Sequence, residues 1–527
     1  MKATKILSLV LAFAMICGMF AACGKTENKT PSEAEINTTY GDGVLDVGMA
    51  YQLTTTTCIR INSGREQQVM HIMYEQLGIF DSEGVLQPWI AKSWKTEDNG
   101  FNYDVEIYDY ITDSEGNKIT ADDIVWNLLE SRERNLRPCF TKVKDVQKTG
   151  DYTFRVTLTD NIIGAFETIM SNVFVVSKAA FENSSNEFAD NIVSTSAYTM
   201  TEYVPGSTIS FEKRADYWQK EELLPENVRP KVEKIRFHTI MEASQMGIAL
   251  DTGKIDIALS MPTATATQFL ERSDFVNEEF PNNQGTTLFF SGAESRPVAN
   301  DVKLRQAICY AIDTAGLLKG TYMDYGTIMY DVCPSRLVGY NPEWEKEDYF
   351  GYNPEKAKQL VAESDYNGQE LEILYKANNI DTRLATMIQT YCGEAGIKIK
   401  LKGLDASAVA AIRLDGNEYD MFINRNGGVY CADHWQIRYD PKGYANGDAT
   451  SRKDFVLGDM MYKTWTNDGY TQENIDDVHE YLRDNAIAYG MLAPSLFNVW
   501  NQNLEVTDKV LYENGGISVQ SSTYTRY

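Results

Sequence analysis

Residues 371–402 read LEILYKANNIDTRLATMIQTYCGEAGIKIKLK, and this stretch decides the fold class. It begins with an apolar, strand-favouring run at 371–375. Apolar residues then recur every three or four positions from Leu384 to Ala395, as on one face of a helix. Residues 397–402 alternate with a period of two, which is typical of a half-buried strand. Strand, helix and strand in this order form the crossover unit of an α/β layer, whose loops at strand ends are natural ligand sites.

The same local signals predict elements on both sides of this unit. Asn followed by Pro marks a helix start at Asn353, and Asp or Asn before an apolar-periodic run can cap a helix. The chain is therefore expected to contain a strand at 44–50, a helix capped by Asn300 over 300–312, a helix started by Asn353, a helix opened by Asp381 and ended by Gly396, and a strand at 419–423.

Composition excludes several functional classes. The chain has 527 residues and a formal net charge of −26, which argues against nucleic-acid binding and against docking on anionic lipid. Its four histidines are scattered, and it contains no zinc-protease, nucleophile-elbow or phosphate-loop motif. We therefore expect no enzyme, no cofactor and no metal site. A surface hydrolase of peptides or glycans stays the rival class, because paired carboxylates need no local motif.

The first residues resemble an export signal. Two lysines precede an apolar run from Ile6 to Phe20, and Ala21-Ala22 precede Cys23. A cysteine in this place is typical of a bacterial lipoprotein signal, in which the Cys23 sulfur takes a diacylglyceryl group. Residues 1–22 would then be the signal and 23–43 a polar tether. Each CH₂ of an acyl chain that is buried in the bilayer adds about 0.8 kcal/mol to the free energy of membrane binding, so the lipid would hold the chain on a membrane. An incidental cysteine after an ordinary signal would not.

Six cysteines follow Cys23 and are dispersed along the chain, and none forms a Cys-x-x-Cys pair. An exported protein permits disulfides, but six cysteines allow 15 connectivities. No bridge is therefore assigned.

Several short stretches, weak singly, occur together in a characteristic order. They are Tyr74-Glu75-Gln76-Leu77, residues 84–94, Ile119 to Trp126, Ala197-Tyr198 with Asp216-Tyr217-Trp218, residues 249–258, Leu304-Arg305-Gln306-Ala307 and residues 352–360. Together they resemble the family 5 extracellular solute-binding proteins, the peptide-binding components of ABC importers. One of them, Thr120 with Asp123, also has the spacing of a helix capping box.

The resemblance implies a two-lobed, periplasmic-binding-protein-like α/β fold of type II, in the three-domain peptide-binding variant with a hinge and an interlobe cleft. One lobe would combine residues 44–60, 187–285 and 496–527 with an inserted domain at 61–186, and the other would span 286–495. Closure around a solute would be a population shift that the importer's permease subunits recognise. The protein would be a monomer, anchored on the outer face or the periplasmic side of the cell membrane.

The resemblance also implies ligand residues. The stretch Tyr430-Cys431-Ala432-Asp433 is similar to a family run whose carboxylate pairs with a peptide α-ammonium. Asp433 is thus the expected amine anchor, with Tyr430 and Trp435 as aromatic walls. Arg425 is a candidate for clamping a carboxylate. Thr55, in the threonine run after the first strand, is a candidate for hydrogen bonds to the peptide backbone.

Two departures leave the ligand class open. His434-Trp435 follows Asp433 in place of the usual acidic residue and Pro, and residues 194–198 read STSAY where the family has GTGPY. Lost glycines and a lost proline change the turn geometry. A di- or oligopeptide is the first expectation, and an oligosaccharide or a metal chelate is the alternative.

Overall fold

The computed structural model describes residues 43–60, 66–81, 83–189, 191–281, 284–439, 441, 453–508 and 517–526. They lie within one compact unit, Tyr40–Tyr527. The expected signal and tether, with Cys23, lie outside the described residues.

The described residues build a mixed sheet of 12 strands, four of which pair antiparallel with one long central strand. In order across the sheet these are β16 (Ile399–Leu404), β15 (Leu371–Lys376), β17 (Met421–Gly427), β13 (Gln284–Phe290), β18 (Ala488–Asn501), β11 (Ile257–Met261), β1 (Val44–Met49), β10 (Lys234–Thr239), β9 (Thr208–Lys213) and β8 (Tyr198–Val204), with β12 (Phe275–Pro281) and β14 (Gly326–Ile328) also paired to β18.

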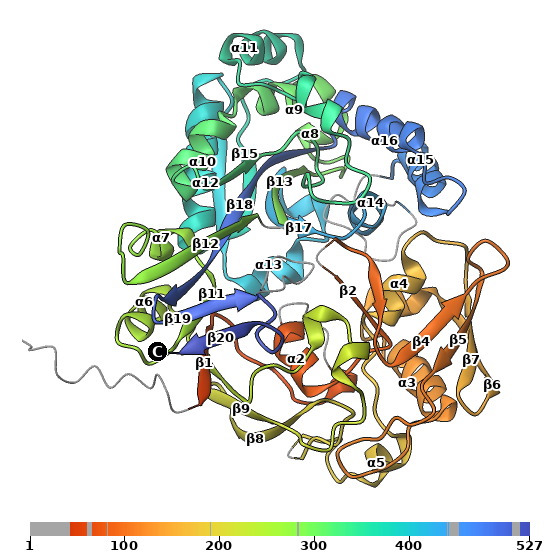
Figure 1. Cartoon of the computed structure of the whole chain (residues 1–527). Coiled ribbons are helices and arrows are strands. Elements are labelled where there is room, and N and C mark those ends of the chain that lie inside the picture. The colour runs from red at the N-terminus through yellow and green to blue at the C-terminus, as the bar shows by residue number, and fades with distance from the viewer. Residues whose placement is uncertain are drawn as a thin grey trace, which may run out of the picture. The chain divides into compact units, whose positions relative to one another are not determined.

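Strand β18 joins two groups of strands because it changes partners midway. Residues 488–494 pair with β13 and β14, whereas residues 495–501 pair with β11 and β12. Pro494 lies at the change, where a missing N–H costs least. Figure 1 shows β18 running between the part that holds β1 and β11 and the part that holds β15 and β17. The chain crosses between the two groups here and between β12 and β13.

The predicted crossover unit is confirmed. Strands β15 and β16 pair in parallel from Leu371 opposite Ile399, and α12 (Asn379–Glu394) connects them. The helix begins earlier than predicted, because the Asn378 side chain accepts from the Asp381 N–H and caps it. Gly396, with φ +87°, follows the helix end as expected.

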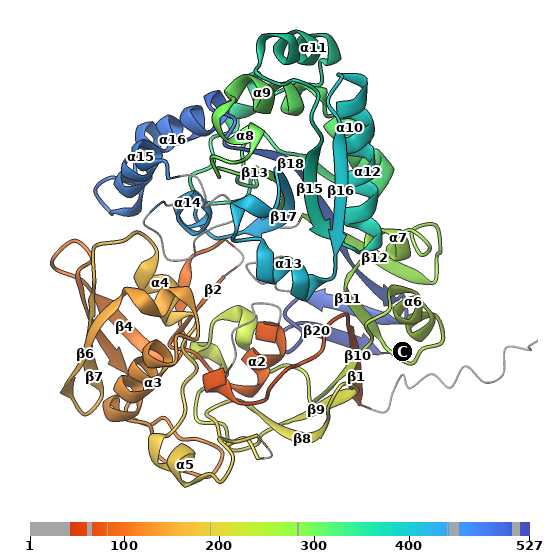
Figure 2. The same cartoon turned by 180° about the vertical axis from the view of Figure 1, so that it is seen from behind.

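The neighbouring helices follow the predicted signals with one correction. Asn353 caps α11 (Pro354–Glu363) as predicted. Asn300 does not cap the helix that follows it. Instead it ends the short α8 (Pro297–Asn300), and Asp301 caps α9 (Val302–Ala311) by accepting from the Leu304 N–H. The residue whose oxygen reaches this N–H is thus one position later than the pattern suggested. Both views place α9, α10 (Thr314–Tyr322), α11 and α12 around β15 and β16 (Figures 1 and 2).

A second, antiparallel sheet lies in the segment expected as an inserted domain. Its order is β4 (Ala91–Lys95), β5 (Asn102–Ile107), β7 (Thr153–Leu158) and β6 (Val143–Gly150). Helix α3 (Ala121–Glu133) packs against it and begins with the predicted capping box, in which the Thr120 N–H donates to Asp123 at 2.8 Å. Helices α4 (Ala165–Met170) and α5 (Lys178–Asn183) complete this part.

The remaining elements are short. They are the helices α2 (Gln67–Met73), α6 (Ala243–Asp251), α7 (Thr263–Ala266), α13 (Ala406–Ile412), α14 (Cys431–Tyr439), α15 (Phe455–Trp465) and α16 (Gln472–Asp484), the strand pairs β2 (Gly78–Phe80) with β3 (Leu86–Pro88) and β19 (Leu504–Asp508) with β20 (Thr523–Arg526), and 3₁₀ turns at Cys58–Arg60, Pro138–Lys142, Glu221–Leu223, Glu226–Val228, Pro342–Lys346 and Gly416–Glu418.

The apolar core is continuous across the predicted domain boundaries. One buried cluster joins side chains of residues 77–175 to side chains of residues 289–488. A second cluster lies within residues 288–492, and a third joins residues 45–74 to residues 174–259 and 500–519. The inserted segment therefore packs against both groups of strands in this conformation. The domain boundaries stay a prediction, although the partner change in β18 falls next to the expected boundary at 495/496.

Candidate ligand-binding site

The candidate site is the segment that leaves β17 and enters α14. Strand β17 ends with Gly427 opposite Gln284, next to the chain crossing between β12 and β13. Two backbone hydrogen bonds then hold the segment, one from the Val338 N–H to the Val429 carbonyl and one from the Cys431 N–H to the Val338 carbonyl. The first turn of α14 is therefore fixed beside the crossing.

Tyr430 lies between two segments that are distant in sequence. Its ring meets the Tyr470 ring edge-on at 5.9 Å. On another side it contacts Gly164, where an added Cβ would overlap the Tyr430 ring. Gly164 belongs to the inserted segment, so the predicted aromatic wall lies where residues 61–186 meet residues 286–495.

Asp433 lies in the first turn of α14, a position at which the helix dipole favours a carboxylate. Its side chain is outside the part that the structure describes. His434 and Trp435 beside it are buried, with relative exposures of 1% and 0%. Burial, with a contribution from Arg438, lowers the pKa of His434 to about 4, so this imidazole is neutral at physiological pH. The Trp435 indole N–H has no hydrogen-bond partner among the described residues.

Arg425 is held by groups of the same segment, residues 286–495. Its Nη2 donates to Asp381 Oδ1 at 2.6 Å and to the Tyr322 hydroxyl at 3.2 Å. Asp381 is buried, whereas the Arg425 side chain keeps 25% exposure. The Nε and Nη1 groups of Arg425 make no hydrogen bond to a described residue.

The threonine run after β1 divides into structural and open positions. Thr56 and Thr57 are buried, and the Thr56 hydroxyl donates to the Ala189 carbonyl. Thr55 is half-buried and accepts from the Thr57 N–H at 3.0 Å. In the described part of the chain, no hydrogen bond, ion pair or ring contact joins Thr55 to Tyr430, Trp435 or Arg425.

The substituted turn at residues 194–198 is stabilised by its hydroxyls. The Ser196 hydroxyl donates to the Ile72 carbonyl at 2.6 Å and accepts from the Tyr198 N–H. Ser194, Thr195 and Ser196 are all buried. These polar residues thus replace the usual turn chemistry with side-chain hydrogen bonds and add no exposed ligand contact.

Glu75 is a buried carboxylate that was not among the candidate residues predicted from the sequence. Glu75 is 1% exposed and accepts hydrogen bonds from the Trp89 indole at 3.2 Å, the Trp218 indole at 2.9 Å and the Tyr217 hydroxyl. Burial raises the pKa of Glu75 to about 7, against these hydrogen bonds, which lower it. The sequence signal was present, since all four residues lie in the motifs quoted above, but only the fold brings them together.

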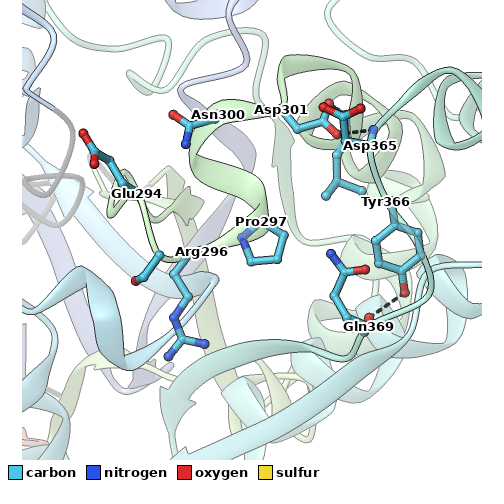
Figure 3. A pocket seen from close by; sticks show the side chains of 10 residues that line it. Glu294, Arg296, Pro297, Asn300, Asp301, Asp365, Tyr366 and Gln369 are labelled. Carbon is cyan, nitrogen blue, oxygen red and sulfur yellow. Dashed lines mark hydrogen bonds between the residues drawn. The ribbon is translucent and has the colours of Figure 1, made fainter.

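A surface pocket of about 270 Å³ lies away from these residues, between the start of α9 and the turn after α11 (Figure 3). Two of its charged side chains, Arg296 and Asp301, already make hydrogen bonds within the fold. Arg296 donates to the Asn417 carbonyl, and Asp301 accepts from the N–H groups of Leu304 and Asp365. The lining therefore stabilises the fold, and none of the predicted ligand residues belongs to it.

The described residues contain neither a cluster suited to a metal ion nor a helix suited to spanning a membrane. No group of three or more His, Cys, Asp or Glu side chains there is arranged to hold a metal ion. None of the helices described is both long and apolar enough to cross a bilayer.

Comparisons with known proteins agree with the motif order. The family model described as bacterial extracellular solute-binding proteins, family 5 Middle, matches residues 85–447. The glutathione-binding protein GsiB of Escherichia coli (strain K12) is 25% identical over 381 residues, which cover 70% of this chain and 71% of that protein. The oligopeptide-binding protein AppA of Bacillus subtilis (strain 168) is 22% identical over 438 residues, 78% of each chain.

The fold is similar to that of a solved relative. The crystal structure of the ABC transporter substrate-binding protein CtaP from Listeria monocytogenes superposes with a TM-score of 0.76 and 20% identity, covering 88% of this chain and 95% of that one.

Proposed function

The chain belongs to family 5 of the bacterial extracellular solute-binding proteins and has their type II α/β fold, and on this premise we propose that it captures peptides between two lobes for an ABC importer. The lobes would be residues 44–60, 187–285 and 496–527 with the inserted domain 61–186, and residues 286–495. The permease would be the partner that recognises the closed form. The observation that best supports this proposal is the contact of Tyr430 with Gly164, because the predicted ligand loop would then lie where the two proposed lobes meet.

Asp433 would accept the peptide α-ammonium, since a desolvated ammonium is costly unless a carboxylate meets it. The guanidinium group of Arg425 would take a carboxylate. Tyr430 and Trp435 would form the walls, and the unpartnered Trp435 N–H would donate to the solute. Thr55 would reach the peptide from the other lobe. The names of GsiB and AppA, which state glutathione and oligopeptide binding, favour a peptide over an oligosaccharide or a metal chelate.

Calorimetric titration with a library of short peptides tests the proposed function. Asp433→Asn should weaken binding by roughly 1.5–3 kcal/mol, the scale of a hydrogen bond to a charged group. N-acetylated peptides should lose the same amount against the unmodified protein. Asp365→Asn, an exposed aspartate of residues 286–495, is the matched control and should bind normally. Equal binding of free and acetylated peptides would remove Asp433 from this role.

We also propose that Cys23 carries the lipid that holds the chain on the membrane. Cys23→Ser should release the protein from the membrane fraction into the soluble fraction, while peptide affinity stays unchanged. A variant that remains in the membrane fraction would contradict the anchor.

A further inference from the structure

Residues 160–164, between β7 and α4, lie alongside residues 462–467 at the end of α15. Together these two segments form a contact that we name the latch. The Ile163 N–H donates to the Trp465 carbonyl at 2.5 Å, and the Asn467 N–H donates to the Asn161 carbonyl at 3.0 Å. Ile162 and Thr466 form an isolated antiparallel bridge. Two backbones from distant parts of the chain thus pair as a short ladder.

Side chains extend this pairing on both sides. The Tyr462 hydroxyl donates to Asp160 Oδ2 at 2.5 Å, and the side-chain amide of Asn467 donates to the Asn99 backbone carbonyl at 2.9 Å. Ile162 and Trp465 are buried between them, whereas Tyr462 is 50% exposed. The latch therefore has a small apolar centre and a polar, solvent-facing rim.

The latch also touches the predicted ligand loop. Gly164 has φ +67°, a left-handed backbone that side chains rarely adopt, and its missing Cβ leaves room for the Tyr430 ring. Any movement of residues 160–164 away from residues 462–467 therefore removes one wall from Tyr430.

The chain crosses between the two groups of strands in β18 and between β12 and β13, and the latch includes neither crossing. Residues 160–164 belong to the inserted segment, and residues 462–467, at the end of α15, belong to the segment 286–495. A rotation about β18 that separates the two groups breaks every latch contact at once. The hydrogen bonds of the latch involve none of the predicted ligand residues, so they stabilise this arrangement whichever solute is bound.

We propose that the latch holds the two lobes together in the ligand-free protein and thereby sets the affinity for all solutes by one common factor. This inference rests on the proposed function, because it assumes that the closed form is the binding form. The apparent dissociation constant equals the intrinsic constant divided by the closed fraction. Asn467 and Tyr462 are accordingly positioning residues, which alter the closed fraction and touch no solute.

Hydrogen exchange of the full chain without any ligand tests the latch directly. The Ile163 and Asn467 amides should be protected in the wild type. In the Tyr462→Phe/Asn467→Ala double variant they should exchange at least tenfold faster. The Leu158 amide, bonded to Phe101, and the Asn485 amide, bonded to Tyr481, each lie within one side and should be unchanged, which reports that the variant is folded.

A second readout separates closure from ligand contact. For any two peptides that bind, the dissociation constants of the double variant should rise by the same factor, and Tyr352→Phe, an exposed tyrosine elsewhere, should leave them unchanged. Unprotected Ile163 and Asn467 amides in the wild type, or equal exchange in both proteins, would overturn the latch. A chain that binds no peptide would instead contradict the proposed function, and the exchange result would still decide on the latch.

Discussion

Two of the junctions between the inserted segment, residues 61–186, and the rest of the protein differ in character. At the first, the buried carboxylate of Glu75 collects donors from Trp89, Tyr217 and Trp218. At the second, the latch, backbone groups and the Tyr462–Asp160 pair meet at a half-exposed rim. Separating the first junction would leave the buried carboxyl group of Glu75 without its donors, which is expensive, whereas water can replace the bonds of the latch. The inserted segment should therefore move with residues 187–285 and part from residues 286–495.

The largest expected effect is at the Glu75 junction. Trp89 is 3% exposed, packs with Ile79, Leu224 and Val228, and donates to Glu75. Trp89→Ala should lower the free energy of unfolding by about 3–5 kcal/mol, as for other large-to-small core changes. Trp89→Phe keeps most of the packing and should cost only about 1–3 kcal/mol for the unmatched carboxylate. Urea denaturation measures both, and a loss from Trp89→Ala below about 1 kcal/mol would show that this junction is not a fixed point.

A smaller effect concerns pH. Burial raises the pKa of Glu75 from 4.5 to about 7, so between these values the folded protein holds a proton that the unfolded chain has released. Stability from this group is thus complete below pH 4.5 and falls as the pH rises towards 7, by about 3 kcal/mol. Glu75→Gln should flatten this slope in urea denaturation at pH 5 and pH 8, and the exposed Glu83→Gln should keep it. Identical slopes for wild type and Glu75→Gln would refute the assignment.

The smallest expected effect is at the latch. Gly164→Ala places a side chain in left-handed backbone, at about 1–2 kcal/mol, and against the Tyr430 ring. Gly206→Ala is the matched control, because Gly206 has φ +72° but only Gln52 near its missing Cβ. Both variants should lose similar stability, but only Gly164→Ala should speed exchange of the Ile163 and Asn467 amides. Equal exchange in the two variants would mean that Gly164 does not support the latch.

The parts of the fold that the sequence predicted are those with local causes. The periodicities of residues 371–402 gave β15, α12 and β16, because a helix face and an alternating strand are written into neighbouring positions. Caps were misplaced at Asn300 and Asp381, because in both places a neighbouring Asp or Asn reaches the same helix N-terminus. Strand β18 is apolar along nearly its whole length, so periodicity does not distinguish it from a buried helix.

The site was less predictable than the fold. The motif at Tyr430 to Asp433 carries the resemblance, but the burial of His434 and Trp435 and the pairing of Arg425 with Asp381 depend on packing between distant segments. The latch had no sequence signal, since its main bonds join backbone groups some 300 positions apart, and backbone groups are the same in every sequence.

Native mass spectrometry of the full chain, freshly purified from its own membrane, tests the central claim most directly. A receptor that closes on peptides should retain a one-to-one population of short peptides, which denaturation releases intact and which added peptide replaces. A protein that carries no solute, takes up none from a peptide mixture, or returns the peptides cleaved would contradict the account.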